Sequence, residues 1–272
     1  MIELSGVTKV FNPGRAGEVT AVAAADLTVA AGEFVSLIGP SGCGKSTLLR
    51  LIADLVPPSS GTVTVAGKPA ARARRDRDYG MVFQKAGLFD WRTVRRNVEL
   101  PLELRGTGRS ERHARAAEML ELVGLSEFAS HYPAQLSGGM QQRVSIARAL
   151  ADAPPLLLMD EPFGALDEMT RERLQGELLR ICAATGTTVV FVTHSIDEAV
   201  FLSGRVAVMS ARPGRITDVI DVDLGERTEA VRQAPEYFGY VTAVRQALRG
   251  PAAAVPEQAG PAESAPAVRA EK

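Results

Sequence analysis

The chain has 272 residues, of which 46% are hydrophobic and 23% are charged, and its formal net charge is −1. These values are ordinary for a folded globular protein and exclude a highly charged disordered chain. The small net charge provides no overall field to attract nucleic acid, and two cysteines are too few for a disulfide framework. No apolar run approaches the roughly 18–20 residues that span a bilayer, and no signal-peptide pattern opens the chain, so we expect a cytoplasmic protein.

The first part of the chain is predicted to contain mostly strands. Residues 2–11 and 19–30 have the apolar spacing of strands, and a turn rich in glycine separates them. Residues 33–38 are a short apolar run that indicates a buried strand, and residues 48–53 have the pattern of a helix.

Two further short strands are predicted at residues 62–65 and 81–83. Residues 72–78 lie between them and are rich in charge, which favours a solvated loop.

A change to mainly helical patterns follows, from about residue 93 to residue 151. Within it, Ser110 is a suitable N-cap for a helix that Gly124 would end. This part of the chain is therefore predicted to be a helical insertion in an α/β framework.

Strand and helix patterns alternate in the second half of the chain. Apolar runs predict strands at residues 156–159, 188–192, 205–209 and 215–222, and helical patterns occur at residues 169–183 and 196–202. Continuous apolar runs indicate a parallel sheet that is covered on both faces, so we expect an α/β fold. Residues 229–248 predict a final helix, and the Ala- and Pro-rich residues 250–272 are expected to be disordered.

A glycine-rich segment, GPSGCGKST, joins the strand at 33–38 to the helix at 48–53. This strand–loop–helix context is the one in which the pattern GxxxxGK[ST] binds nucleotide phosphates. The glycines allow backbone N–H groups to converge on an anion, and the following helix adds its positive end. Lys45 is expected to reach the β- and γ-phosphates, and the Ser46 hydroxyl to hold Mg²⁺. The predicted nucleotide-binding residues are Gly39, Pro40, Ser41, Gly42, Cys43, Gly44, Lys45, Ser46 and Thr47.

Four polar side chains follow predicted strands, at the edge where parallel sheets bind ligands. We expect Asp160 to hold Mg²⁺ and Glu161 to act as general base toward an attacking water. His194 could donate a hydrogen bond to the γ-phosphate, and Gln84 could ligate the metal through its carbonyl, although either residue alone would more often be structural. The predicted metal ligands are Ser46, Gln84 and Asp160, and the predicted catalytic residues are Glu161, His194 and Gln84.

A second glycine-rich helix start occurs in LSGGMQQRV, at residues 136–144. Ser137 and two glycines precede a long helical pattern, which builds a second anion site. An ordinary serine N-cap with a flexible loop would have the same sequence features. Because the first loop already holds the phosphates of one nucleotide, the second site would bind another phosphate group or approach the nucleotide from another side.

In these motifs and their order, the chain resembles the nucleotide-binding subunits of ATP-binding cassette (ABC) transporters over about residues 1–222. GPSGCGKST is similar to the Walker A motif of that family, LLLMDEP to its Walker B motif and LSGGMQQRV to its signature. The resemblance implies that ATP is the nucleotide, that Phe11 stacks on adenine, that Gln84 lies in the Q-loop and that His194 is the switch histidine. It implies a D-loop of Ala165, Leu166 and Asp167, and signature residues Leu136, Ser137, Gly138, Gly139, Met140 and Gln141 that act on ATP held by a second subunit.

The resemblance also implies an architecture and an assembly. Residues 1–222 would form an ABC ATPase domain of the P-loop NTPase class. Its RecA-like parallel-sheet core would carry an antiparallel β subdomain and a helical subdomain inserted at about residues 86–153. Beyond the part that the resemblance covers, residues 223–249 are expected to be a C-terminal helical extension. Two copies would form a head-to-tail homodimer that hydrolyses ATP and docks, as a peripheral protein on the cytoplasmic side of the inner membrane, on integral-membrane permease subunits, without nucleic acid.

A narrower resemblance concerns the transported solute. The segments LFDWRTVRRNVELPLELRG, THSIDEAV and MSARPGRI are similar to the ATPases of nitrate, taurine and alkanesulfonate importers. This implies uptake of a small anion that a solute-binding protein delivers. Thiamine-precursor and bicarbonate importers remain alternatives, because the same family contains them. A non-transport ABC ATPase is disfavoured because no long coiled coil or zinc module interrupts the chain, and a small-molecule kinase would leave LSGGMQQRV unexplained.

Four positions depart from the usual pattern of the family. Asp54 replaces the usual Gly after the first helix, and Asp90 replaces the usual Pro before Trp91. Phe11 stands where Tyr is commoner, which preserves stacking but removes a hydroxyl group. Ser195 follows the histidine where Asp is usual, and Ser can still cap the helix that is predicted there.

Overall fold

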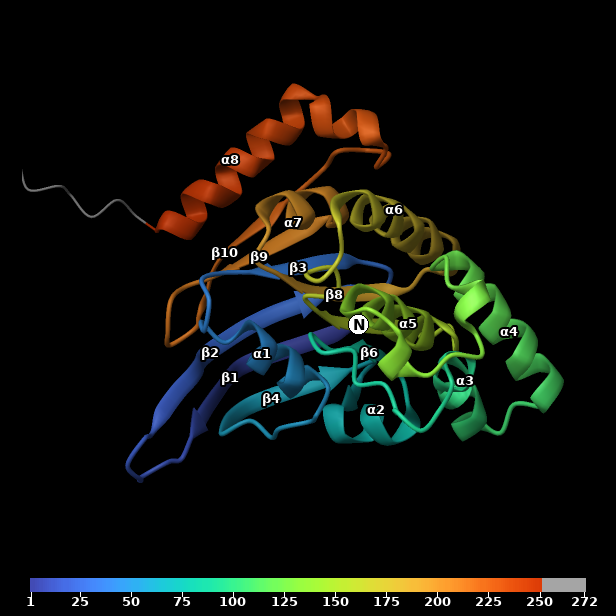
Figure 1. Ribbon diagram of the computed structural model, residues 1–272. Coiled ribbons are helices and arrows are strands. Elements are labelled where there is room, and N and C mark those ends of the chain that lie inside the picture. The colour runs from blue at the N-terminus through green and yellow to red at the C-terminus, as the bar shows by residue number, and fades with distance from the viewer. Residues whose placement is uncertain (251–272) are drawn as a thin grey trace, which may run out of the picture.

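A six-stranded sheet forms the centre of the computed structural model, which describes residues 1–250 (Figure 1). The predicted disorder of the C-terminal tail lies outside the described residues. The sheet has the order β10-β9-β3-β8-β7-β6. Its strands are β3 (Phe34–Ile38), β6 (Gly80–Val82), β7 (Leu156–Asp160), β8 (Thr188–Thr193), β9 (Arg205–Met209) and β10 (Ile216–Asp221). All neighbouring pairs are parallel except β9 and β10, so the predicted parallel sheet is confirmed with one antiparallel edge strand.

A second sheet is entirely antiparallel and has the order β2-β1-β4-β5. Its strands are β1 (Ile2–Phe11), β2 (Val19–Val29), β4 (Ser60–Val65) and β5 (Lys68–Pro69). Together with α1 (Lys45–Ile52), it covers one face of the parallel sheet. The loop between β3 and α1 lies beside β2 of this sheet, with Gly44 next to Ala21 and Val22.

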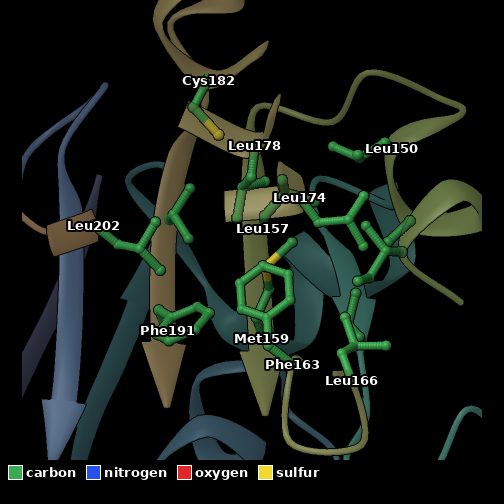
Figure 2. Close-up of a cluster of buried hydrophobic side chains, with 14 of the residues drawn as sticks. Leu150, Leu157, Met159, Phe163, Leu166, Leu174, Leu178, Cys182, Phe191 and Leu202 are labelled. Atoms are coloured by element: carbon green, nitrogen blue, oxygen red, sulfur yellow. The ribbon is translucent and has the colours of Figure 1, made fainter. Parts of the chain in front are cut away.

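The central strands alternate their side chains between two hydrophobic cores. In β7, Leu156 and Leu158 pack toward α1 and the antiparallel sheet. Leu157 and Met159 point to the other face, where Figure 2 shows them beside Phe191 and the side chains of α6 (Glu168–Thr185). Every residue of β7 is buried, which explains the unbroken apolar run that precedes Asp160.

The helices on this second face come from the predicted insertion and from the last part of the chain. They are α3 (Val94–Arg105), α4 (Arg109–Leu122), α5 (Gly138–Leu150), α6, α7 (Ile196–Leu202) and α8 (Pro235–Arg249). The first three pack on one another and lie at the right of Figure 1. Within residues 1–250, no helix combines the length and the apolar character that crossing a bilayer requires.

The prediction of a solvated loop at residues 72–78 is wrong, because most of this segment belongs to α2 (Ala70–Asp76). The alanines and arginines of this segment have high helix propensity, and Ala70 and Ala73 are buried. Arg72 also forms an i,i+4 ion pair with Asp76. The charges therefore cover the outer side of a helix that the apolar alanines attach to the core.

The prediction that Ser110 is the N-cap is also wrong, because α4 begins at Arg109. Gly108 is the N-cap, and its carbonyl already accepts the bond from the N–H of Arg112. Gly108 adopts the extended backbone of an N-cap residue, so Ser110 lies inside the first turn.

The predicted final helix is divided into two parts. A 3₁₀ turn, η3 (Glu229–Gln233), is followed by α8, and Ala234 between them has an extended backbone. Pro235 causes this break, because proline disfavours helical backbone in the residue before it and suits the first position of a helix. α8 packs on α7, β9 and β10, at the top of Figure 1.

Candidate nucleotide-binding site

The backbone of the loop between β3 and α1 can be formed only with glycine at critical positions. Gly42 and Gly44 have φ values of 74° and 112°. A Cβ atom on Gly44 would lie 2.5 Å from the carbonyl oxygen of Ala21 in β2. Gly44 is the N-cap of α1 and has no side chain to cap it, so the first-turn N–H groups can bind an anion.

Lys45, the first residue of α1, turns back over this loop. Its Nζ atom donates to the carbonyl oxygens of Gly39 and Pro40, at 2.7 and 3.1 Å, and the residue is only 6% exposed. The ammonium group is therefore held within the loop, where phosphate oxygens would meet it.

A hydroxyl–carboxylate pair adjoins the loop. The Ser46 hydroxyl donates to Oδ1 of Asp160, the last residue of β7, at 2.8 Å. Burial raises the pKa of the Asp160 carboxyl above its ordinary value, and the hydrogen bond from Ser46 opposes this effect only partly. Mg²⁺ prefers hard oxygen ligands and commonly binds one or two carboxylates together with substrate phosphates, so this pair is suited to it.

Glu161 follows directly but points elsewhere. Its φ of 47° is left-handed, a conformation that non-glycine residues rarely adopt. The Nδ1 atom of His194 lies 3.3 Å from Oε2 of Glu161, and the amide of Gln84 donates to the same oxygen at 3.3 Å. Three side chains that follow β6, β7 and β8 thus meet, as the parallel-sheet prediction implied.

These residues surround one cavity of about 610 Å³. Its lining includes Phe11, Ser41, Gly42, Gly44, Lys45, Ser46, Thr47, Gln84, Glu161 and His194. The Phe11 ring is 38% exposed, and the Lys9 ammonium lies 5.2 Å from the ring centroid. The cavity therefore places an accessible aromatic ring, a phosphate-binding loop and three polar side chains around one volume.

Arg212 also lines this cavity, although no sequence pattern predicted it there. Its Nε and Nη2 atoms donate to the Gly42 carbonyl, at 3.3 and 3.2 Å. Arg212 lies between β9 and β10, far along the chain from the loop. The only indication in the sequence is that Arg212 follows an apolar strand, within MSARPGRI. The spacing along the chain does not predict that Arg212 contacts Gly42.

The signature and D-loop residues lie outside this cavity. Within residues 1–250, its lining contains none of residues 136–141 or 165–167. Ser137 is the N-cap of α5, and its hydroxyl accepts from the N–H of Met140 at 3.3 Å. Asp167 caps α6 in the same way, and the hydrogen bond from Thr170 lowers the pKa of its carboxyl. A Cβ on Gly139 would lie 3.1 Å from the Ala165 carbonyl oxygen, so the two segments adjoin each other.

Ser195 caps α7, as the sequence predicted. Its hydroxyl accepts from the N–H of Glu198 at 3.3 Å. The substitution at this position therefore preserves the cap of the helix that follows His194.

Known proteins share both the sequence and the fold. Residues 22–164 match the model of the family described as "ABC transporter". The nitrate import ATP-binding protein of Synechocystis sp. is 45% identical over 256 residues, which are 92% of this chain and 95% of that protein. The taurine import ATP-binding protein of Rhizobium johnstonii is 50% identical over 210 residues, which are 75% and 79% of the two chains.

Among solved structures, a dimeric post-hydrolysis state of the ATP-binding cassette MJ0796 with ADP and Pi superposes with a TM-score of 0.76 and 38% identity. The match covers 82% of this chain and 99% of that one. The P-loop architecture that the motifs predicted is thereby confirmed. The chain belongs to the ATP-binding, ATP-hydrolysing subunits of ABC transporters.

Proposed function

We propose that this chain drives an importer for a small anion of the nitrate, taurine or alkanesulfonate class. The observation that carries the ATPase part is the meeting of Gln84, Glu161 and His194 beside the phosphate-binding loop. The solute class is supported by the two import proteins to which the chain is 45% and 50% identical.

The adenine ring and the phosphates of ATP bind at different ends of the cavity. Phe11 stacks on the adenine ring, while Lys45 and the N–H groups at the start of α1 bind the phosphates. Ser46, Asp160 and Gln84 would hold Mg²⁺, which would neutralise charge on the phosphate oxygens. Arg212 fixes the Gly42 carbonyl and so stabilises the loop.

Hydrolysis requires a positioned water and a base. Glu161 accepts the proton of the water whose oxygen attacks the γ-phosphorus, and ADP leaves with the electron pair of the broken P–O bond. His194 and Gln84 flank the Glu161 carboxylate, so they orient it and the water. His194 also donates to the γ-phosphate as negative charge develops there.

A second copy of the chain completes each site. The helix start at Ser137 and Gly139 lies outside the cavity of its own subunit, and it would press on the γ-phosphate bound by the partner. The dimeric state of the related cassette supports the pairing of two copies. Residues 165–167 adjoin Gly139 and would lie at the same interface.

The domains of the chain have separate proposed roles in the transporter. Residues 1–222 act as the ATPase domain, with the helical part at about 86–153 facing integral-membrane permease subunits. Residues 223–249 form a C-terminal helical extension of that domain. The assembly lies on the cytoplasmic side of the inner membrane, and a solute-binding protein delivers the anion.

The catalytic assignment is tested with Glu161→Gln. The variant should bind ATP as the wild type does, because the phosphate-binding loop is unchanged. Its hydrolysis rate should fall by about 10²–10⁴-fold, because the amide cannot accept the proton. Phosphate release and nucleotide binding measure the two effects separately. Glu121→Gln, at an exposed position of α4, is the matched control. Turnover of Glu161→Gln near that of the control would remove Glu161 from the role of base.

The solute is tested on the complete transporter in vesicles with its binding protein. Nitrate, taurine or an alkanesulfonate should increase ATP hydrolysis and should itself accumulate. Stimulation by a thiamine precursor or bicarbonate instead would contradict the proposed class of solute and leave the ATPase mechanism unaffected.

A further inference from the structure

We propose that the C-terminal extension positions the turn that carries His194, through Arg232, Gln175 and Glu198. This inference rests on the role of His194 in the proposed function. It makes residues 223–249 a determinant of the hydrolysis rate, although none of them lines the nucleotide cavity within the described part of the chain.

The turn is held on both sides of His194 by Glu198, through its partly buried carboxylate on Thr193 and its backbone N–H on Ser195. The Thr193 hydroxyl donates to Oε2 of Glu198 at 2.5 Å, and the N–H of Ser195 donates to the same Thr193 hydroxyl at 3.0 Å. The N–H of Glu198 in turn donates to the Ser195 hydroxyl. The His194 side chain is itself 65% exposed, so the neighbouring backbone determines where the imidazole lies.

The other oxygen of Glu198 is held from α6. The amide of Gln175 donates to Oε1 at 3.3 Å, and Nε of Arg171 lies 3.8 Å from it. Gln175 is 1% exposed, and an unpaired amide at such a depth would be unfavourable. Since its NH₂ group donates to Glu198, its carbonyl oxygen needs a donor from the opposite direction.

Arg232 is that donor, and it belongs to η3 in the extension. Its Nη2 atom donates to Oε1 of Gln175 at 2.6 Å. Its guanidinium carbon lies 3.7 Å from the ring centroid of Phe201 in α7, which fixes the side chain between α6 and α7. A continuous series of contacts thus runs from the extension to both neighbours of His194.

Two further contacts attach the extension to the same helix. The Tyr237 hydroxyl donates to the backbone oxygen of Asp197 at 3.2 Å, and the guanidinium of Arg227 donates to the carbonyls of Val200 and Ser203. α8 lies beside α7 in Figure 1. The extension therefore restrains α7 at its first turn and at its end.

Residues of this hydrogen-bond network also line a cavity beside Glu161 and His194. Glu198, Arg171 and Thr193 line a smaller cavity of about 270 Å³ that Glu161 and His194 line as well. Arg171 additionally donates to the Leu166 carbonyl at 2.8 Å, in the segment expected at the subunit interface. Movement of Glu198 would therefore displace the His194 turn relative to Glu161.

The first test is Arg232→Ala in the full-length chain. Losing the donor frees the Gln175 amide to turn, which weakens its hold on Glu198. The kcat for ATP should fall by about three- to tenfold, the range expected for coupling through a contact network. The KM for ATP should stay within about twofold, because the residues that bind ATP are untouched. Arg245→Ala, at an exposed position of α8, is the matched control and should resemble the wild type.

Two more variants separate positioning from loss of structure. Arg232→Lys should recover part of kcat, because the ammonium can still donate to Gln175. Gln175→Met removes both hydrogen bonds while filling a similar volume, so it should lower kcat as Arg232→Ala does. Thermal unfolding of every variant identifies any that fail to fold. If Arg232→Ala fails to fold, the kcat of Gln175→Met tests the inference in its place.

A double-mutant cycle with His194→Ala gives the decisive result. If Arg232 acts through the His194 turn, Arg232→Ala should cause no further loss in the His194→Ala background. An equal loss in both backgrounds, or wild-type kcat for Arg232→Ala, would overturn the inference while leaving the proposed function in place. A His194→Ala variant that hydrolyses ATP at the full rate would instead contradict the proposed role of His194.

Discussion

At Asp160, the proposed binding of Mg²⁺ conflicts with the stability of the fold. Its carboxyl is buried at the end of β7, and burial raises its pKa in the folded state. As pH rises, the unfolded chain therefore loses this proton before the folded protein does. The free energy of unfolding falls through the interval between the two pKa values and stays lower above it.

Asp160→Asn should therefore increase stability at neutral pH. The amide oxygen can still accept from Ser46, and the buried charge is removed. Thermal unfolding should show a higher midpoint than the wild type at pH 7, with the difference vanishing below about pH 4, the ordinary pKa of Asp. ATP hydrolysis should be lost if Asp160 is the Mg²⁺ ligand that we propose, because the variant has no carboxylate there. Asp218→Asn, at an exposed position of β10, is the control, and an equal gain there would contradict the explanation.

At the scale of elements, Asn97 joins α3 to the segment before it. This fully buried side chain accepts from the N–H of Phe89 at 2.8 Å. Its NH₂ group lies 3.1 Å from each of the carbonyl oxygens of Phe89, Arg92 and Thr93. The segment carries Trp91, whose side chain is largely exposed, so Asn97 fixes a surface that faces outward.

Asn97→Ala should loosen this segment while leaving the phosphate-binding loop intact. The unpaired backbone groups should reduce the free energy of unfolding by about 1–3 kcal/mol, measured by denaturant unfolding. Basal ATP hydrolysis should change little, whereas binding to the permease should weaken, as co-purification would show. Unchanged permease binding, with the stability loss observed, would place the docking surface elsewhere.

The sequence predicted the elements whose signal is local. Apolar runs located the central strands, and the glycine pattern located the phosphate-binding loop. The residues that follow the strands met as expected, because parallel strands end at one edge. The charged residues of α2 led to the wrong prediction of a loop, because the sequence pattern did not show that the alanines of this helix are buried in the core. Arg212 and Arg232 could not be found, because their partners lie far away in sequence and only the fold brings them together.

At the scale of the whole molecule, each site is proposed to be shared between two copies. This can be tested by mixing subunits that carry Lys45→Ala with subunits that carry Ser137→Ala. In a mixed head-to-tail dimer, one site then contains both lesions and the other contains none. Hydrolysis by the mixture should exceed the sum of the separate activities. If Ser137 acted within its own subunit, both sites would remain defective and no gain would appear.

The left-handed backbone of Glu161 has a consequence for selection experiments. This conformation costs a residue with a side chain about 1–2 kcal/mol, and glycine adopts it readily. A randomised library at position 161 that is screened only for folded protein should therefore enrich Gly or Asn. The same library screened for growth on the transported solute should recover Glu. The two screens would thus favour different residues at one position, because backbone geometry and the proposed proton transfer place opposing demands on it.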